Sequence, residues 1–247
     1  MKQLHDRVAV VTGASSGLGR AIAEAFAEEG AKVVLAARRA NVLEEVAAGI
    51  RARGGTAAVA PTDVTKEADV QALFLKAKGS YGRVDILVNN AGVPNFKPTE
   101  EMSLKEWQEI VDLNFTAVFL CSREALKVMK AQGGGRIINM GSISAWSPRP
   151  HSIGYTSTKA AVEALTRSLT YDGRAYGVVA SVIHPGATAT GFTKGRTPGP
   201  GATPPDYLMA PEHIARIAVL MCALPPEVNL FDATVLPNHQ KSFFGRG

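Results

Sequence analysis

The stretch "VAVVTGASSGLGRAIAEAFAEEGAKVVLAARR", residues 8–39, decides the fold of this chain of 247 residues. It predicts a short apolar strand, a glycine-rich turn, an amphipathic helix and a second apolar strand. Glycines in such a turn let the backbone approach a pyrophosphate, and the N–H groups at the start of the helix point at the anion. Alone, the glycines would indicate only a tight turn, but their place between strand and helix favours nucleotide binding. The expected contacts are Gly13, Ser15, Ser16, Gly17, Leu18 and Gly19.

The alternation of strand and helix continues along the rest of the chain. Apolar runs predict strands at 7–12, 32–37, 57–62, 85–88, 136–140, 178–184 and 232–236. Amphipathic stretches predict helices near 17–29, 41–53, 66–80, 103–131, 154–176 and 211–223. Nearly all-apolar strands between helices are typical of a parallel sheet covered on both faces. We expect one α/β domain over residues 1–247, a doubly wound, Rossmann-like sheet of about seven strands.

Composition excludes several other classes of protein. The chain is 46% hydrophobic and 20% charged, with a net charge of +5, an ordinary globular balance. Its basic residues are scattered, so we expect no nucleic-acid partner. Cys121 and Cys222 lack the spacing of a metal site or a disulfide framework, and we expect no metal. No signal peptide or apolar run of ~20 residues occurs, which predicts a soluble cytoplasmic protein without a membrane partner.

Two residues in "YTSTK", Tyr155 and Lys159, stand four positions apart. Residues at this spacing are neighbours on one face of a helix, so the phenol and the ammonium can meet. Taken by itself, such a pair is equally a solvated surface contact. The choice depends on the motifs that accompany it.

Several motifs in register resemble the short-chain dehydrogenase/reductase family in its compact form. "TGASSGLG" (12–19) resembles the cofactor turn of the family, and "NNAG" (89–92) resembles the motif that ends its fourth strand. "PGATAT" (185–190) resembles the segment that touches the nicotinamide, with Thr190 at the carboxamide-binding threonine. Asp63 and Val64 stand where the family contacts the adenine. The resemblance implies further cofactor contacts at Asn90, Ala91, Gly92, Pro185, Gly186 and Thr188.

The resemblance also implies a catalytic tetrad of Asn114, Ser142, Tyr155 and Lys159. A free phenol has a pKa of about 10, and a nearby ammonium favours its ionised form, so Tyr155 would serve as general acid and base. Ser142 would stabilise the charge that develops on the substrate oxygen. Lys159 would also hold the cofactor ribose, and Asn114 would position a water that relays protons. Individually, Ser142 could be a turn residue and Asn114 a buried hydrogen-bonding residue.

The second predicted strand is followed directly by Arg38 and Arg39, and the next acidic residue is Glu44. An acidic residue at this place suits the ribose of NAD, whereas an arginine suits a 2′-phosphate. We therefore expect NADP(H) as the cofactor. The alternative is that both arginines merely end a strand in water. Ser16 stands where many NADP-dependent relatives carry a basic residue, so Arg38 has less support from neighbouring charges in binding a 2′-phosphate.

Residues 186–208 contain 5 glycines and 4 prolines and show little periodicity. A long irregular segment after the carboxyl end of a strand favours a substrate lid over plain disorder. We expect the substrate pocket to be lined by aromatic and polar residues near the tetrad and in this segment, although such residues often only pack. They are Asn95, Phe96, Ser144, Trp146 and Tyr207.

The predicted function is that of an NADP(H)-dependent oxidoreductase acting on a small ketone or aldehyde and its alcohol. One alternative is a 3-oxoacyl carrier-protein reductase, although the C-terminal part lacks the glycine pair often found in such reductases. An alternative of another class is a non-catalytic dinucleotide sensor or scaffold, against which the complete tetrad argues. By resemblance we expect a homotetramer.

Overall fold

The computed structural model describes residues 2–191 and 208–238. Its strands are β1 (Val8–Thr12), β2 (Lys32–Ala37), β3 (Thr56–Pro61), β4 (Ile86–Asn89), β5 (Gly135–Met140), β6 (Val178–Pro185) and β7 (Asp232–Val235). Within the described residues they form one sheet of seven strands in the order β3-β2-β1-β4-β5-β6-β7. Every neighbouring pair is parallel. The doubly wound parallel sheet predicted from the sequence is confirmed.

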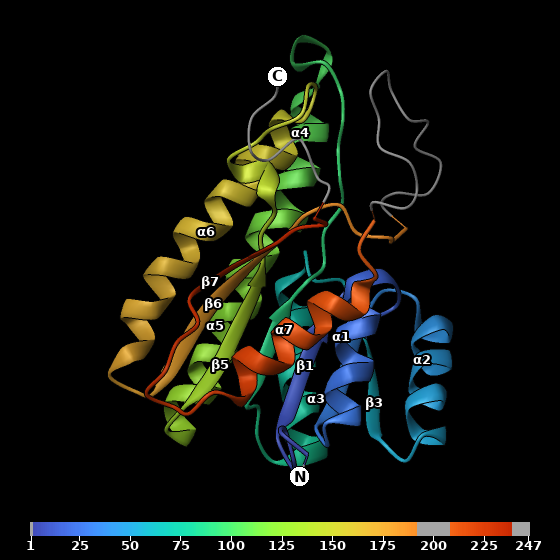
Figure 1. Cartoon of the computed structure of the whole chain (residues 1–247), viewed down its shortest axis with the longest axis vertical. Helices are drawn as coiled ribbons and strands as arrows, with labels where there is room; N and C mark the ends of the chain where they lie inside the picture. Colours follow the sequence, from blue (N-terminus) through green and yellow to red (C-terminus); the bar gives the residue numbers. More distant parts are fainter. Residues whose placement is uncertain (1, 192–207, 239–247) are drawn as a thin grey trace.

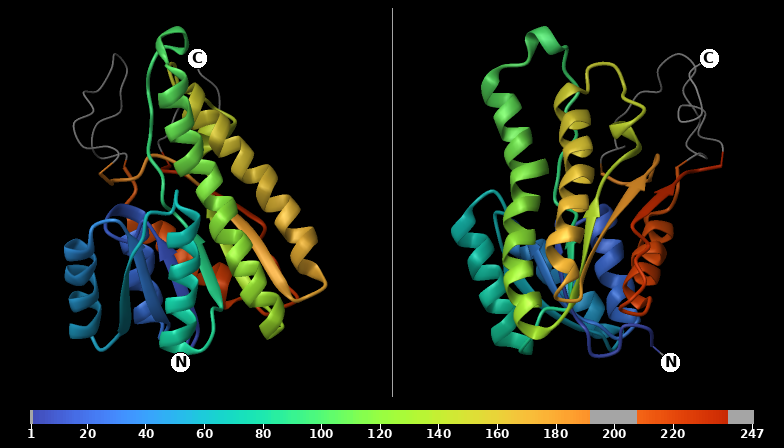
Figure 2. Two further views of the ribbon diagram at one scale, coloured as in Figure 1. Left: turned by 180° about the vertical axis from the view of Figure 1, so that it is seen from behind. Right: turned by 90° about the vertical axis from the view of Figure 1, so that its left-hand side faces the viewer.

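Helices cover both faces of the sheet. They are α1 (Gly17–Glu28), α2 (Ala40–Ala52), α3 (Glu67–Tyr81), α4 (Leu104–Val111), α5 (Ala117–Gln132), α6 (Ile153–Arg174) and α7 (Pro211–Ala223). Helices α1 and α7 lie in front of the sheet in Figure 1, and α3, α5 and α6 face the viewer in the left view of Figure 2. This arrangement predicts one hydrophobic core on each side of the sheet.

The two cores divide the strand residues by alternation. In β1, Ala9 and Val11 pack on the side of α1, α2 and α7, while Val10 packs on the side of α3, α5 and α6. In β2, Val33 and Leu35 face α1, α2 and α7, and Val34 faces α3, α5 and α6. Alternate side chains of a strand point to opposite faces, and both faces here are apolar. This explains why the strands appear in the sequence as continuous apolar runs.

The segment predicted as one helical stretch near 103–131 is divided in the structure. Helix α4 ends at Val111, a π-helical turn spans Asp112–Thr116, and α5 begins at Ala117. Such a turn is rare inside helices and occurs frequently at functional sites. It contains Asn114, which is fully buried.

Short helical turns and one isolated bridge complete the described residues. The turns are η1 (Thr99–Glu101) and η3 (Ile143–Ala145), which belong to the connections after β4 and β5. Thr188, after β6, forms a parallel bridge with Met209. No described helix combines the length and apolarity needed to cross a membrane.

Candidate active site

The site lies where the strand order reverses. Strands β1, β2 and β3 progress in one direction from the centre of the sheet, and β4 to β7 progress in the other. Open α/β sheets bind ligands outside the carboxyl ends of the strands at such a point. The glycine turn follows β1 there, and residues 89–92 follow β4 beside it.

Hydrogen bonds of Asn90 link these two connections. Its Nδ2 donates to the carbonyl oxygens of Thr12 at 3.0 Å and Gly13 at 3.3 Å. In return, the Thr12 hydroxyl accepts from the backbone nitrogens of Asn90 at 3.0 Å and Ala91 at 3.1 Å. The turn is therefore held in one shape from the neighbouring strand.

The glycines in the turn are required by crowding and by backbone angle. Gly13 and Gly17 have φ values of 66° and 55°, in the left-handed region that favours glycine. A Cβ atom on Gly19 would lie 2.4 Å from both the Gly13 carbonyl oxygen and Asn90 Nδ2. Helix α1 begins at Gly17, and the side chain of its N-cap residue Ser16 makes no capping bond. The turn thus fits a pyrophosphate, with the first N–H groups of α1 available to the anion.

The expected adenine and 2′-phosphate residues lie at the carboxyl ends of β2 and β3. Arg38 and Arg39 are exposed, and Arg39 Nη2 lies 3.4 Å from Ser15 Oγ on the glycine turn. Hydrogen bonds from Thr65, helped by the charges of Lys66 and Arg38, hold the pKa of the Asp63 carboxyl below its usual range. Val64 is buried beside it. These groups form a polar, partly basic margin beside the turn.

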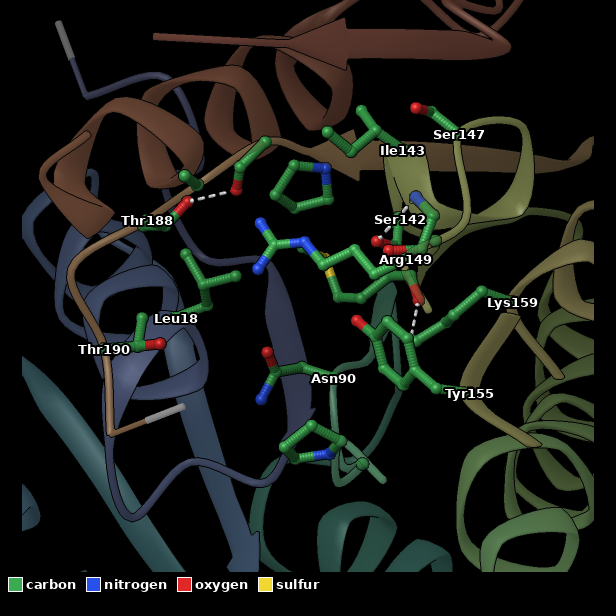
Figure 3. Close-up of a pocket in the computed structure, with 18 of the residues that line it drawn as sticks. Leu18, Asn90, Ser142, Ile143, Ser147, Arg149, Tyr155, Lys159, Thr188 and Thr190 are labelled. Carbon is green, nitrogen blue, oxygen red and sulfur yellow. Dashed lines mark hydrogen bonds between the residues drawn. The ribbon is translucent and has the colours of Figure 1, made fainter. Parts of the chain in front are cut away.

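A cavity opens between the glycine turn and the beginning of α6 (Figure 3). It brings together Tyr155 and Lys159 from α6 with Ser142, which follows β5. The lining includes nine of the residues that the sequence predicts for cofactor, catalysis or substrate besides these three: Leu18, Asn90, Gly92, Phe96, Ser144, Pro185, Gly186, Thr188 and Thr190. Residues far apart in the sequence therefore share one space.

Lys159 is buried beneath this cavity. Its Nζ donates to the carbonyl oxygen of Met140 at 2.7 Å and lies 5.7 Å from the centre of the Tyr155 ring. Burial lowers the pKa of the Lys159 ammonium to about 8. The expected pair of phenol and ammonium on one helix face is thus present, and the ammonium lies within the protein rather than in water.

Ser142 and Asn114 are each held by local hydrogen bonds. Ser142 Oγ accepts from the backbone nitrogen of Ser144 at 3.1 Å. Asn114 Nδ2 donates to the carbonyl oxygen of Val93 at 2.9 Å, and Asn114 Oδ1 accepts from the Val93 nitrogen at the same distance. Both polar atoms of the Asn114 side chain are therefore engaged by the connection after β4, which they hold beside the cavity.

Only some of the residues expected in the substrate pocket line the cavity. Phe96 lines the cavity and has its ring centre 6.5 Å from that of Tyr155. Trp146 is not among the described lining residues, because its ring packs at 4.2 Å on the buried His184 and its Nε1 donates to Glu163 at 3.0 Å. Asn95 also lies outside the described lining. Tyr207 and residues 192–207 of the expected lid lie outside the described residues.

The sequence patterns did not point to several residues at the site, among them Arg149 and His184. Arg149 lines the cavity from the connection between η3 and α6. His184, near the end of β6, contacts the backbone of Ser142 through Nδ1 at 3.2 Å. The position of Arg149 between Ser142 and Tyr155 in the sequence was a signal that it lies near the cavity. His184 had no such signal, because the contact depends on the pairing of β5 with β6.

A doubly wound sheet with a glycine turn at its switch point, and with a tyrosine, a lysine and a serine in the adjoining cavity, defines a dinucleotide-dependent oxidoreductase. The family model for short chain dehydrogenases matches residues 7–200. The chain belongs to the short-chain dehydrogenase family, and the family resemblance found in the sequence is confirmed. Proteins of this family bind a nicotinamide dinucleotide.

Individual relatives agree with this assignment over nearly their whole length. An uncharacterized oxidoreductase of Staphylococcus aureus (strain MRSA252) is 35% identical over 237 residues, which cover 96% of this chain and 100% of the relative. The alcohol dehydrogenase of the archaeon Thermococcus sibiricus, solved with 5-hydroxy-NADP, has a TM-score of 0.85 at 30% identity, covering 95% of this chain and 98% of its own. The 3-ketoacyl-(acyl-carrier-protein) reductase of Brucella melitensis, solved with NADH, has a TM-score of 0.87 at 31% identity, with coverage of 95% and 98%.

Proposed function

We propose that this oxidoreductase uses NADP(H) and interconverts a small ketone or aldehyde with its alcohol. The observation that carries the proposal is the meeting of Tyr155, Ser142 and Lys159 in one cavity beside the glycine turn. The glycine turn is tightly packed, since a Cβ atom on Gly19 would collide with Gly13 and Asn90, and the first N–H groups of α1 beside it would suit an anionic pyrophosphate. When bound, the nicotinamide supplies or accepts the hydride.

The residues of the chain supply the proton and stabilise the charge. In reduction, the Tyr155 hydroxyl donates a proton to the carbonyl oxygen of the substrate, and in oxidation the phenolate takes it back. The Lys159 ammonium favours the phenolate through its positive charge. The Ser142 hydroxyl donates a hydrogen bond to the same substrate oxygen, where negative charge develops. Asn114 positions the connection after β4 and, in this proposal, a water that returns protons to Lys159.

The cofactor residues follow from their place around the turn. Gly13, Ser15, Ser16 and Gly17 would hold the pyrophosphate, and Arg38 and Arg39 the 2′-phosphate. Asp63 and Val64 would contact the adenine. The segments 90–92 and 185–190 would enclose the nicotinamide ribose and ring, since both line the cavity.

A 3-oxoacyl carrier-protein reductase is the second candidate, and the similarity to the Brucella melitensis reductase favours it. We further propose a homotetramer in the cytoplasm. Large apolar side chains remain exposed in the chain, with Leu104 on α4 at 80% and Phe119 on α5 at 48%, which suits a surface covered by another copy. Light scattering at micromolar concentration tests the assembly.

The function is tested with a panel of ketones, aldehydes and 3-oxoacyl thioesters, followed by the absorbance of reduced nicotinamide. Tyr155→Phe should lower kcat by about 10²–10⁴-fold and leave NADPH binding intact, because only the hydroxyl is removed. Tyr171→Phe is the matched control, since Tyr171 lies on the same helix but is 72% exposed. A Tyr155→Phe enzyme that keeps its kcat would refute the assignment of the proton donor.

A further inference from the structure

The buried imidazole of His184 lies between the turn that begins at Ser142 and the last strand of the sheet. In the pairing of β6 with β7, His184 is opposite Thr234, and Asp232 lies two residues earlier on the same face of β7. Asp232 Oδ2 approaches His184 Nε2 to 3.2 Å. The other ring nitrogen, Nδ1, lies 3.2 Å from both the backbone nitrogen and the carbonyl oxygen of Ser142. The imidazole therefore connects a carboxylate with the backbone of the serine in the cavity.

The position of the imidazole proton decides which backbone group of Ser142 is bound. A neutral imidazole carries a proton on one nitrogen and a lone pair on the other. With the proton on Nε2, His184 Nδ1 accepts a hydrogen bond from the Ser142 N–H. With the proton on Nδ1, that hydrogen bond is lost, and the ring donates to the Ser142 carbonyl oxygen instead. The two tautomers thus hold the same turn by different atoms.

Asp232 places a negative charge beside Nε2. Its side chain is 34% exposed, and its Oδ1 accepts from Thr234 Oγ1 at 3.4 Å. Asp232 Oδ2 and His184 Nε2 lie at ion-pair distance without the alignment of a hydrogen bond, so the influence of the carboxylate is electrostatic. A negative charge next to Nε2 favours the form that carries a proton there. The partner of one ring nitrogen commonly determines the state of the other.

The surroundings of the His184 ring leave it little room to move. The Trp146 indole packs on one face with 4.2 Å between the ring centres, and its Nε1 donates to Glu163 at 3.0 Å. On the edge of the ring, a Cβ atom on Gly141 would lie 2.6 Å from Nδ1. The ring is fully buried. The place of the imidazole is therefore fixed by packing, and the position of its proton is what can change.

We propose that Asp232 is a positioning residue that keeps the His184 proton on Nε2, so that Nδ1 binds the Ser142 N–H. The inference rests on the proposed function, in which the Ser142 hydroxyl binds the substrate oxygen. Ser142 Oγ accepts from the Ser144 nitrogen within the same turn, so a shift of the Ser142 backbone would move the hydroxyl. Asp232 does not belong to the described lining of the cavity and acts through the imidazole alone.

Nitrogen NMR of the cofactor-free protein, labelled in its histidines, tests the inference without any substrate. Protonated and unprotonated ring nitrogens differ in chemical shift, and the His184 signals are those that disappear in His184→Asn. In mildly alkaline buffer the wild type should carry the proton on Nε2. Asp232→Asn should add a population protonated on Nδ1, whereas Asp232→Glu keeps the charge and should keep the wild-type tautomer. A wild-type imidazole protonated on Nδ1 or on both nitrogens, or an unchanged tautomer in Asp232→Asn, overturns the inference.

Kinetics then measure the effect on the reaction. Asp232→Asn should lower kcat roughly fivefold, the change that corresponds to about 1 kcal/mol for a partly exposed ion pair, and should leave the Kd for NADPH unchanged. Asp232→Glu should restore most of kcat. Asp172→Asn is the matched control, because it removes the same charge from an exposed position on α6 and should change neither kcat nor the tautomer.

The outcomes separate this inference from the proposed function. A shifted tautomer with an unchanged kcat overturns the positioning role, and so does an equal loss of kcat in Asp232→Asn and Asp232→Glu, which would show that shape matters rather than charge. If the wild type reduces no ketone or aldehyde, the proposed function fails. A tautomer that shifts in Asp232→Asn would even then support Asp232 as the group that sets the imidazole proton.

Discussion

The imidazole of His184 reaches across from β6 to the backbone of Ser142, with Nδ1 at 3.2 Å from the Ser142 nitrogen. The imidazole is fully buried, and its Nε2 lies 3.2 Å from Asp232 Oδ2 on β7. A Cβ atom on Gly141 would lie 2.6 Å from His184 Nδ1, so the glycine before Ser142 makes room for the ring. Three neighbouring strands thus position the serine that we propose to bind the substrate oxygen.

The first prediction concerns this contact. His184→Ala leaves the Ser142 N–H without its acceptor and should lower kcat about tenfold, as expected for one buried group left unsatisfied. His184→Asn places an amide oxygen near the former Nδ1 and should restore most of kcat. The Kd for NADPH should stay unchanged in both variants. Equal loss in the Ala and Asn variants would show that His184 only fills space.

The second prediction contrasts two glycines. Gly19→Ala would force a methyl group to 2.4 Å from the Gly13 carbonyl oxygen, so the turn must deform and the Kd for NADPH should rise at least about tenfold. Gly49→Ala is the control, because the nearest group to its Cβ is Arg53 Nη1 at 3.7 Å, within α2. It should stabilise the protein by about 0.5–1 kcal/mol and leave binding alone. NADPH titration by fluorescence, with thermal melts, checks both. Unchanged affinity in Gly19→Ala would contradict the pyrophosphate assignment.

Much of this architecture follows from local sequence signals. Apolar runs located the strands to within a residue or two, because strands buried on both faces have little room for polar side chains. The glycine turn was located because its crowding and backbone angles admit only glycine at Gly13 and Gly19. The Tyr155–Lys159 pair was found because helical spacing makes them neighbours.

Other features depend on tertiary contacts that a linear pattern does not record. The π-helical turn at Asn114 joins α4 directly to α5, and residues 103–131 contain no glycine or proline that would mark the division in the sequence. Trp146 was expected in the pocket, but an indole packs equally well elsewhere, and its partners His184 and Glu163 come from β6 and α6. Arg149 lies in an irregular connection whose path no periodicity describes.

The third prediction concerns Lys159 and the pH dependence of stability. Burial lowers the pKa of this ammonium to about 8 from an unfolded value of 10.5. Between these pH values the unfolded state binds more protons than the native state, so the free energy of unfolding rises with pH. Below pH 8 the burial of the charged ammonium lowers the free energy of unfolding by its full amount, on the order of 3 kcal/mol for a shift of this size.

Lys159→Met removes the titrating group while keeping a long side chain. The variant should be more stable than the wild type near pH 7, and the difference should shrink by up to about 3 kcal/mol as the pH rises from 8 to 10.5. Urea unfolding of the cofactor-free protein at several pH values measures it. A difference that does not change with pH would mean that the ammonium is not desolvated. Activity should be lost at every pH, since Tyr155 loses its neighbouring cation.

The last prediction is a preference for NADPH over NADH, carried mainly by Arg38. The arginine is exposed at the end of β2, close enough to Asp63 for its charge to help lower the pKa of that carboxyl. A 2′-phosphate accepts charge-assisted hydrogen bonds from a guanidinium, each worth about 1.5–3 kcal/mol. This implies a preference of roughly ten- to over a hundred-fold. Arg39 turns toward Ser15 Oγ, so Arg39→Ala should have the smaller effect.

Arg38→Asp should reverse the preference, because a carboxylate repels the 2′-phosphate and accepts hydrogen bonds from the ribose hydroxyls of NADH. Arg51→Asp is the control, since Arg51 lies near the far end of α2, where it donates to the Ala57 carbonyl. It should leave the ratio of the two cofactors unchanged. The measurement is kcat/KM for NADPH and NADH in the wild type and each variant. An unmutated enzyme that favours NADH would show that Arg38 and Arg39 only end a strand in water and do not bind a 2′-phosphate.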